Sequence, residues 1–305
     1  MKAKARKDGF RMRLAKRQIE ANSLVCIGID PLEKKLPEPI FEKFAGVTTE
    51  AMMLWLMKYV DATAPFASMF KPQRAYFEGM RQCDGIAVLR FIVAYIQYHY
   101  PSIPIFLDCK RGDILRTQQQ YGVAHLILDA VDGMNFSPYM GSECMEGLSE
   151  ISGNIDSVVS LCYTSNESAR ETQEVLLADG RQYWEYIADL TLNWAKKLGV
   201  VENAGLVMAA AYERPKKSGH IFTWHLKRGR EIVENDLWFL IPGIGTQGGF
   251  VLQTVKYAFS GPGSMAMNSS SELLFASNSA DFAEASAGKA EELRDHGRAC
   301  VGNTD

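Results

Sequence analysis

The residues best suited to chemistry lie in one octet, residues 107–114, which interleaves acidic and basic side chains. Asp108 and Lys110 are two positions apart, so in a strand their side chains point to the same side. Asp113 follows a glycine and is expected on the adjoining loop. Carboxylates and ammonium groups interleaved in a closed pocket keep one another ionised and offer a substrate charge a fixed field. The alternative is a surface ion-pair cluster of little energetic value.

Two further charged residues and one glycine-rich segment end apolar runs elsewhere in the chain. Lys71 precedes a proline, which holds it in extended geometry, and Asp30 has the same place before Pro31. Each could cap a loop or belong to a site. In residues 242–249, glycines allow backbone N–H groups to approach an anion, and Gln247 adds a donor. This segment predicts a phosphate site, although a tight structural turn would also explain it.

Eight short, β-rich apolar runs must position these residues. Several are continuous rather than alternating, as in parallel strands buried on both faces, and helix-periodic segments such as 51–60 and 183–198 separate them. This pattern predicts an α/β fold, a (β/α)₈ TIM barrel in a single domain over residues 21–280. A doubly wound open sheet is the alternative, but no GxGxxG follows the first run. The runs are residues 24–29, 66–70, 103–107, 133–136, 157–162, 205–208, 237–241 and 264–267.

The residues that could do chemistry share one position relative to these runs, just after the end of a run. Polar or charged side chains follow most of them, at the carboxyl ends where barrel active sites lie. These residues are Asp30, Lys71, Asp108, Lys110, Ser137, Ser165 and the segment 242–249.

Composition narrows the function classes. The 305 residues carry a formal net charge of −3, without the basic surplus of a general nucleic-acid binder. No stretch approaches the roughly 20 apolar residues of a membrane span. Six cysteines stand at least 18 residues apart, which excludes CxxC pairs. We therefore expect a cytoplasmic protein with no bound metal, no membrane contact and no nucleic-acid partner.

The segments before and after the predicted barrel differ from it in composition. Residues 1–20 carry eight basic and two acidic side chains, which fits either an organelle presequence or a basic amphipathic helix. The helix is favoured because serine is missing, and it places Phe10, Leu14 and Ile19 inward. Residues 281–305 predict a C-terminal surface helix and tail.

The chain resembles the orotidine 5′-phosphate decarboxylase family in motifs that follow the family's order from residue 24 to about residue 277. The resemblance implies a cofactor-free, metal-free decarboxylase that converts orotidine 5′-monophosphate to UMP in pyrimidine biosynthesis and works as a homodimer of barrels. The matching segments are residues 28–31, 70–73, 108–114 with Thr117, 137–141, 164–166 and 242–249.

The resemblance also implies a role for each matching residue. Lys71, Asp108, Lys110 and Asp113 would form a charged network. In it, Lys110 would protonate C6 of the pyrimidine and Asp108 would lie near the departing carboxylate. Asp30 and Lys71 would hold ribose hydroxyls, and Ser165 the pyrimidine. Pro242, Gln247 and the glycines at 243, 245 and 248 would bind the phosphate end. Each site would be completed from the neighbouring subunit by Asp113, Ile114 and Thr117.

Two departures from the family pattern affect the phosphate end. The Ser-Arg-Gly after the last strand reads Ser270-Ser271-Glu272 here, and Gly-Ala-Thr after the sixth strand reads Ala209-Ala210-Ala211. A bidentate Arg–phosphate contact is worth on the order of 3–6 kcal/mol, so its loss lowers kcat/KM by about two to four decades. Arg214 and Lys216 are candidate replacements.

Three functions therefore stay open from the sequence. The first, which we favour, is orotidine 5′-monophosphate decarboxylation, at either a full or a reduced rate. The second is a catalytically silent relative that binds a nucleotide or only dimerises. The third is a metal-dependent decarboxylase or aldolase acting on a sugar phosphate.

Overall fold

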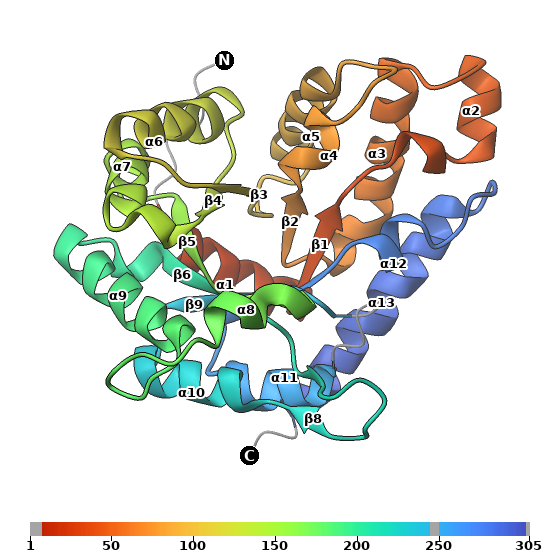
Figure 1. Ribbon diagram of the computed structural model, residues 1–305. Coiled ribbons are helices and arrows are strands. Elements are labelled where there is room, and N and C mark those ends of the chain that lie inside the picture. The colour runs from red at the N-terminus through yellow and green to blue at the C-terminus, as the bar shows by residue number, and fades with distance from the viewer. Residues whose placement is uncertain (1–7, 245–249, 303–305) are drawn as a thin grey trace.

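The computed structural model describes residues 8–244 and 250–302, and eight parallel strands form a nearly closed barrel at its centre (Figure 1). The order around the sheet is β2-β1-β10-β9-β6-β5-β4-β3. The predicted TIM barrel is confirmed. The strands are β1 (Val25–Ile29), β2 (Met69–Pro72), β3 (Phe106–Arg111), β4 (Gly133–Phe136), β5 (Ser157–Tyr163), β6 (Ala204–Met208), β9 (Trp238–Ile241) and β10 (Met265–Ser269).

Strand pairing is irregular in two places, around β3 and at the end of β5, where the pairing with β6 shifts register between Leu161 and Tyr163. Isolated parallel bridges, Phe70↔Ile105 and Gln73↔Asp108, join the edge strands β2 and β3. The pairing of β3 with β4 shifts register between Leu107 and Arg111. β2 extends two residues and β3 four residues beyond the apolar runs that predicted them, because their last side chains face the barrel mouth rather than the core. Lys71, Asp108 and Lys110 therefore lie within strands, not after them as predicted.

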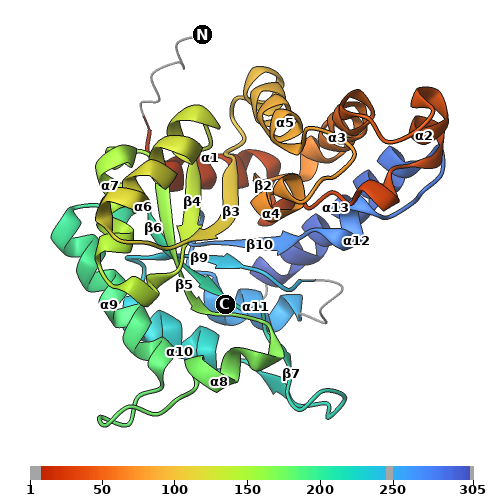
Figure 2. The same cartoon turned by 45° about the horizontal axis from the view of Figure 1, so that its top comes forward.

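Helices cover the outside of the barrel (Figures 1 and 2). α9 has the predicted bounds, and α3 is longer than the predicted segment at both ends. A short antiparallel hairpin, β7 (Tyr212–Glu213) with β8 (Ile221–Phe222), follows β6 and was not predicted. The helices are α1 (Phe10–Ala21), α2 (Glu38–Phe44), α3 (Thr49–Thr63), α4 (Arg74–Glu78), α5 (Gly85–His99), α6 (Leu115–Gly122), α7 (Glu143–Ser152), α8 (Arg170–Gln173), α9 (Tyr183–Leu198), α10 (Trp224–Val233), α11 (Val251–Ala258), α12 (Ser271–Leu274) and α13 (Phe282–Val301).

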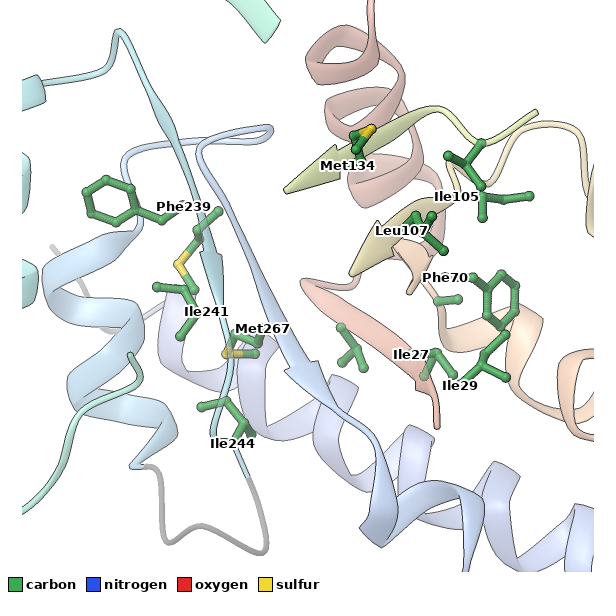
Figure 3. Packing of buried hydrophobic residues seen from close by; sticks show 14 of the residues in the cluster. Ile27, Ile29, Phe70, Ile105, Leu107, Met134, Phe239, Ile241, Ile244 and Met267 are labelled. Atoms are coloured by element: carbon green, nitrogen blue, oxygen red, sulfur yellow. The ribbon is translucent and has the colours of Figure 1, made fainter. Parts of the chain in front are cut away.

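The main hydrophobic core lies between the strands and these helices. Ile27 and Ile29 of β1 lie near Phe70 of β2 in this layer, and all three are fully buried (Figure 3). Each such side chain contributes about 1.5–3 kcal/mol by leaving water. On α9 the predicted apolar face is present, with Trp184 and Ile187 buried. The layer makes a rigid frame for the strand ends.

The amino-terminal end of the barrel is covered by α1. Phe10 stacks on Trp238 with ring centroids 5.3 Å apart, and Leu14 is also fully buried. The prediction for Ile19 was wrong, because its side chain is 68% exposed. Ile19 comes nine residues after Phe10, and at 3.6 residues per turn that separation places it on the opposite side of the helix.

Arginines of α1 attach this helix to the barrel. The Arg17 guanidinium donates to the carbonyl oxygens of Ala64 and Ala67, at 2.7 and 2.9 Å. Arg11 donates to the carbonyl oxygens of Gly263 and Asp236, both at 3.0 Å. Because an arginine offers five N–H donors, it can satisfy carbonyls at loop ends that lack strand partners.

The predictions on membrane spans and on the C-terminal helix can be compared with the structure. Among residues 8–244 and 250–302, no helix is both long and apolar enough to cross a membrane. At the carboxyl end of the chain, α13 packs against α3 and α11, and it buries Phe282, Ala290 and Cys300.

Candidate active site

A cavity of about 620 Å³ opens at the carboxyl ends of the strands. Each side chain in it is positioned by the end of a strand or by the loop that follows, which is the usual place of a barrel active site. The structure thus brings together most of the residues that the sequence selected. The predicted residues in its lining are Asp30, Lys71, Asp108, Lys110, Ser165, Pro242 and Gly243.

Asp108 is the centre of the charged part of this cavity. Its Oδ2 lies 3.0 Å from Lys71 Nζ, and its Oδ1 lies 2.6 Å from Lys110 Nζ. Burial raises the pKa of Asp108, but the ammonium groups of Lys71 and Lys110 outweigh burial and hold this pKa well below its usual range. The carboxylate is therefore ionised at neutral pH and makes an ion pair with each lysine.

The two lysines are in different environments. The Lys71 side chain is 4% exposed, whereas that of Lys110 is 47% exposed. Burial lowers the pKa of Lys71, but the carboxylates of Asp108 and Asp30 more than offset this and raise it above its usual value. Lys71 is therefore a fixed buried cation, and Lys110 is an ammonium group that reaches both the cavity and solvent.

Asp30 presents an unused acceptor to the same cavity. Its Oδ1 is buried and has no hydrogen-bond partner among the described residues. Burial raises the pKa of Asp30, and the charge of Lys71 and a hydrogen bond from the Ser270 side chain only partly oppose this effect. A buried carboxylate oxygen without a donor is costly, so a ligand hydroxyl at this position would stabilise it.

Three predicted residues lie outside the cavity lining. Asp113 is on the loop after β3, where its Oδ1 accepts a hydrogen bond from the Ile114 N–H at 2.8 Å. Ile114 is 54% exposed, and Thr117 is on α6. Of the predicted phosphate-binding residues, Gln247, Gly245 and Gly248 lie outside the described residues.

The β9–β10 side of the cavity is neutral in the part of the chain that the structure describes. Pro242 and Gly243 line it together with Asn268, Ser270 and Ser271, and it has no Lys, Arg or His. The candidate replacement cations are used elsewhere. Both Nη atoms of Arg214 donate to the Glu174 carboxylate at 2.7 Å, and Lys216 pairs with Glu167 at 3.4 Å.

Sequence reasoning missed Asn135, which lines the cavity from β4 and contacts Asp108. Its only signal was a polar residue inside the apolar run 133–136. In a barrel, such a residue either faces the lumen or disrupts the outer core, and here it faces the charged cluster.

Comparison with known proteins agrees with this geometry. The model of the "Orotidine 5'-phosphate decarboxylase / HUMPS family" matches residues 23–285. The orotidine 5'-phosphate decarboxylase of Ralstonia nicotianae is 36% identical over 277 residues, which cover 90% of this chain and 92% of that protein. The chain belongs to the orotidine 5'-phosphate decarboxylase family.

Solved structures give the same result for the family fold. Leishmania donovani UMP synthase superposes with a TM-score of 0.74 at 27% identity, over 96% of this chain and 57% of that chain. Leishmania donovani OMP decarboxylase gives a TM-score of 0.72 at 26% identity, over 94% of this chain and 98% of that one. The family's barrel therefore accounts for nearly the whole of this chain.

Proposed function

We propose that this protein is a carboxy-lyase that decarboxylates orotidine 5′-monophosphate to UMP and CO₂. One observation carries the proposal: Asp108 is held between Lys71 and Lys110 at the mouth of a barrel of this family. The product would enter pyrimidine nucleotide synthesis.

The charged cluster suits a reaction in which a carboxylate is lost and a proton replaces it. A substrate carboxylate next to Asp108 would be repelled, and the repulsion disappears as neutral CO₂ leaves. The electron pair of the broken C6–carboxyl bond stays on C6, where the Lys110 ammonium stabilises it and then donates a proton. Since Lys110 is half exposed, it can recover a proton from solvent. The proposed chemistry uses no cofactor and no metal.

Substrate binding would use the neighbouring groups. The unpartnered Oδ1 of Asp30 and the ammonium of Lys71 would hold ribose hydroxyls, and Ser165 would contact the pyrimidine. Pro242 and Gly243 would lie at the phosphate end, with Gly245, Gln247 and Gly248 completing the phosphate loop.

We also propose that two copies associate through this end of the barrel. Ile114, Tyr139 and Met140 expose 54%, 87% and 47% of their side chains close to the mouth. Exposed apolar groups that gather near a site are typical of an interface. Because Asp113, Ile114 and Thr117 lie outside their own cavity, the cavity of a second copy would receive them.

We propose a reducing, cytoplasmic setting for the protein, which its six free thiols fit.

The neutral β9–β10 side favours one alternative, a relative that binds the nucleotide but turns it over slowly or not at all. Because the described lining residues around Ser271 include no cation, a phosphate dianion would gain no charge-assisted contact from them. Calorimetry with UMP separates the cases, since binding without turnover supports the alternative. A metal-dependent reaction on a sugar phosphate would instead be abolished by EDTA.

The test is a spectrophotometric assay for loss of orotidine 5′-monophosphate. We expect Lys110→Ala to lower kcat by about 10²–10⁴-fold, the usual contribution of a positioned proton donor. Lys197→Ala, at an exposed lysine of α9, serves as the matched control and should change nothing. No turnover by wild type rejects the proposed function, and equal turnover by wild type and Lys110→Ala rejects the proposed role of Lys110.

A further inference from the structure

We propose that Asn135 is a positioning residue, whose carboxamide holds the irregular end of β3 in the shape that brings Lys110 onto Asp108. This inference rests on the proposed function for its catalytic meaning. Asn135 is on β4 and only 1% exposed, so its carboxamide cannot exchange its partners for water.

The end of β3 needs such support because it is not a regular strand. Lys110 has a φ of 47°, a left-handed conformation that costs a residue with a Cβ about 1–2 kcal/mol. The pairing with β4 also shifts register between Leu107 and Arg111. The N–H groups of Cys109 and Lys110 are partly buried and face the Asn135 side chain of β4 instead of a strand carbonyl, and N–H groups turned away from water require an acceptor.

Asn135 supplies that acceptor. Its Oδ1 accepts from the Cys109 N–H at 2.8 Å and from the Lys110 N–H at 2.7 Å. Since both partners can only donate, the oxygen of the carboxamide must face them, and this settles the orientation of the side chain. The amide thus replaces two missing strand hydrogen bonds.

The other end of the same carboxamide acts on the carboxylate. Asn135 Nδ2 donates to Asp108 Oδ1 at 2.7 Å, and this is the oxygen that Lys110 Nζ contacts at 2.6 Å. One side chain therefore fixes the backbone that carries the ammonium group and also the oxygen to which that group pairs. The charged groups facing Asp108 are Lys71 from β2, Lys110 from β3 and Asp30, which directly follows β1.

The outer face of the same segment is held independently. Arg111 Nη2 donates to Glu78 Oε1 at 2.6 Å, and the guanidinium lies 5.0 Å from the centroid of the Tyr121 ring. These contacts hold β3 beyond Lys110 without touching Asp108. Loss of the Asn135 carboxamide is therefore expected to loosen the inner face alone and leave the barrel folded.

Two substitutions separate the two functions of the carboxamide. Asn135→Ala removes both, so we expect faster amide hydrogen exchange at Cys109 and Lys110 and a fall in kcat of about 10- to 100-fold, with KM changed less than threefold. Asn135→Asp keeps the size and the acceptor, so exchange at the two amides should stay slow. Asn135→Asp should therefore remove only the hydrogen bond that the carboxamide donates to Asp108.

The Asn135→Asp variant should also acquire a new pH dependence. Two carboxyls in contact share a proton, which raises the pKa for losing that proton above the ordinary carboxyl range. While it is bound, the proton replaces the lost N–H donor. When it leaves, the two carboxylates repel. The ratio of kcat/KM for variant and wild type should therefore be highest at acidic pH and fall as pH rises, a change that a purely structural role would not cause.

Asn203 provides the matched control. It is 3% exposed, and its Oδ1 likewise accepts from a backbone N–H, that of Arg11, at 3.1 Å, but it lies at the other end of the barrel. Asn203→Ala and Asn203→Asp should lower stability while kcat and the pH profile stay as in wild type. Unchanged exchange in Asn135→Ala, or kcat losses no larger than those of Asn203→Ala, would overturn the proposal. Because exchange needs no turnover, an inactive wild type would count against the proposed function and leave the Asn135 contacts measurable.

Discussion

The β2–β3 side of the cavity and its β9–β10 side differ in how their polar groups are held. On the β2–β3 side, Asp108 pairs with Lys71 at 3.0 Å and with Lys110 at 2.6 Å. On the β9–β10 side, the described lining residues are neutral, including Ser270 and Ser271. In the proposed function the charged side breaks the bond and the neutral side holds the phosphate, so substitutions on the two sides test the two roles separately.

The members of the charged side depend on one another energetically. Lys71 is buried, so removal of its partner Asp108 would leave a charge without compensation, which is strongly destabilising. Each member therefore constrains the others. A residue such as Ser271 at the rim is exposed and makes no such network, so a substitution there costs the fold little.

The largest effect is expected from breaking the charged side with Asp108→Asn. We expect kcat/KM to fall by about 10²–10³-fold, as when one preorganised electrostatic group is removed. The free energy of unfolding should fall by about 3–5 kcal/mol because Lys71 is left buried with less compensation. Enzyme assays and chemical denaturation measure both quantities. Asp236→Asn, in an exposed ion pair with Lys196, should leave both unchanged.

The sign of the pH dependence follows from the low pKa of Asp108. A carboxyl whose pKa is depressed in the folded state contributes stability above its unfolded pKa of about 3.9 and loses it as pH falls. The stability gap between wild type and Asp108→Asn should therefore be full at neutral pH and narrow below about pH 4. A gap that is constant from pH 3 to pH 7 would contradict this account.

A smaller effect, and a gain, is expected from adding a cation to the neutral side. Ser271→Arg should raise kcat/KM for orotidine 5′-monophosphate by about 10- to 100-fold through charge-assisted bonds to phosphate, with no gain for the nucleoside orotidine. Ser279→Arg adds the same charge outside the cavity lining and is the control. Equal gains from the two variants would show that the effect is only general attraction, which high salt should remove.

The smallest effect is expected at Asp30. Because burial raises the pKa of this carboxyl, its charge costs stability once pH exceeds the unfolded pKa of about 4. Asp30→Asn should therefore raise Tm by a few degrees at pH 7, with no gain below pH 4, and weaken UMP binding about tenfold. Thermal denaturation and calorimetry test this together. A lower Tm with unchanged affinity would assign Asp30 to the fold instead of the site.

The elements that sequence reasoning located best were those with the strongest periodicity. α9 begins and ends where its apolar spacing predicted, and all eight barrel strands overlap the predicted runs. The ends of β2 and β3 were placed too early because strand pairing continues through polar residues that face the lumen. The β7–β8 hairpin was missed because two-residue strands leave no pattern.

In the site, too, residues with a clear local pattern were predicted and a residue without one was missed. Asp108, Lys110 and Lys71 were found because charged residues ending apolar runs are conspicuous, and the structure places them in contact. Asn135 was missed because a single amide in an apolar run does not show what it will contact. Its partners are 25 to 27 residues away in sequence, and the irregular backbone of β3 creates the need for it.

The sequence by itself determined the order of strands and helices and the charged residues at the strand ends, because hydrophobic periodicity and residue chemistry are local properties. Only the tertiary structure decided that Asp108 pairs with two lysines at once, that Asn135 supports the bulge of β3, and that Arg214 is occupied by Glu174. These are contacts between distant segments, and their distances depend on closure of the barrel and on the left-handed turn at Lys110.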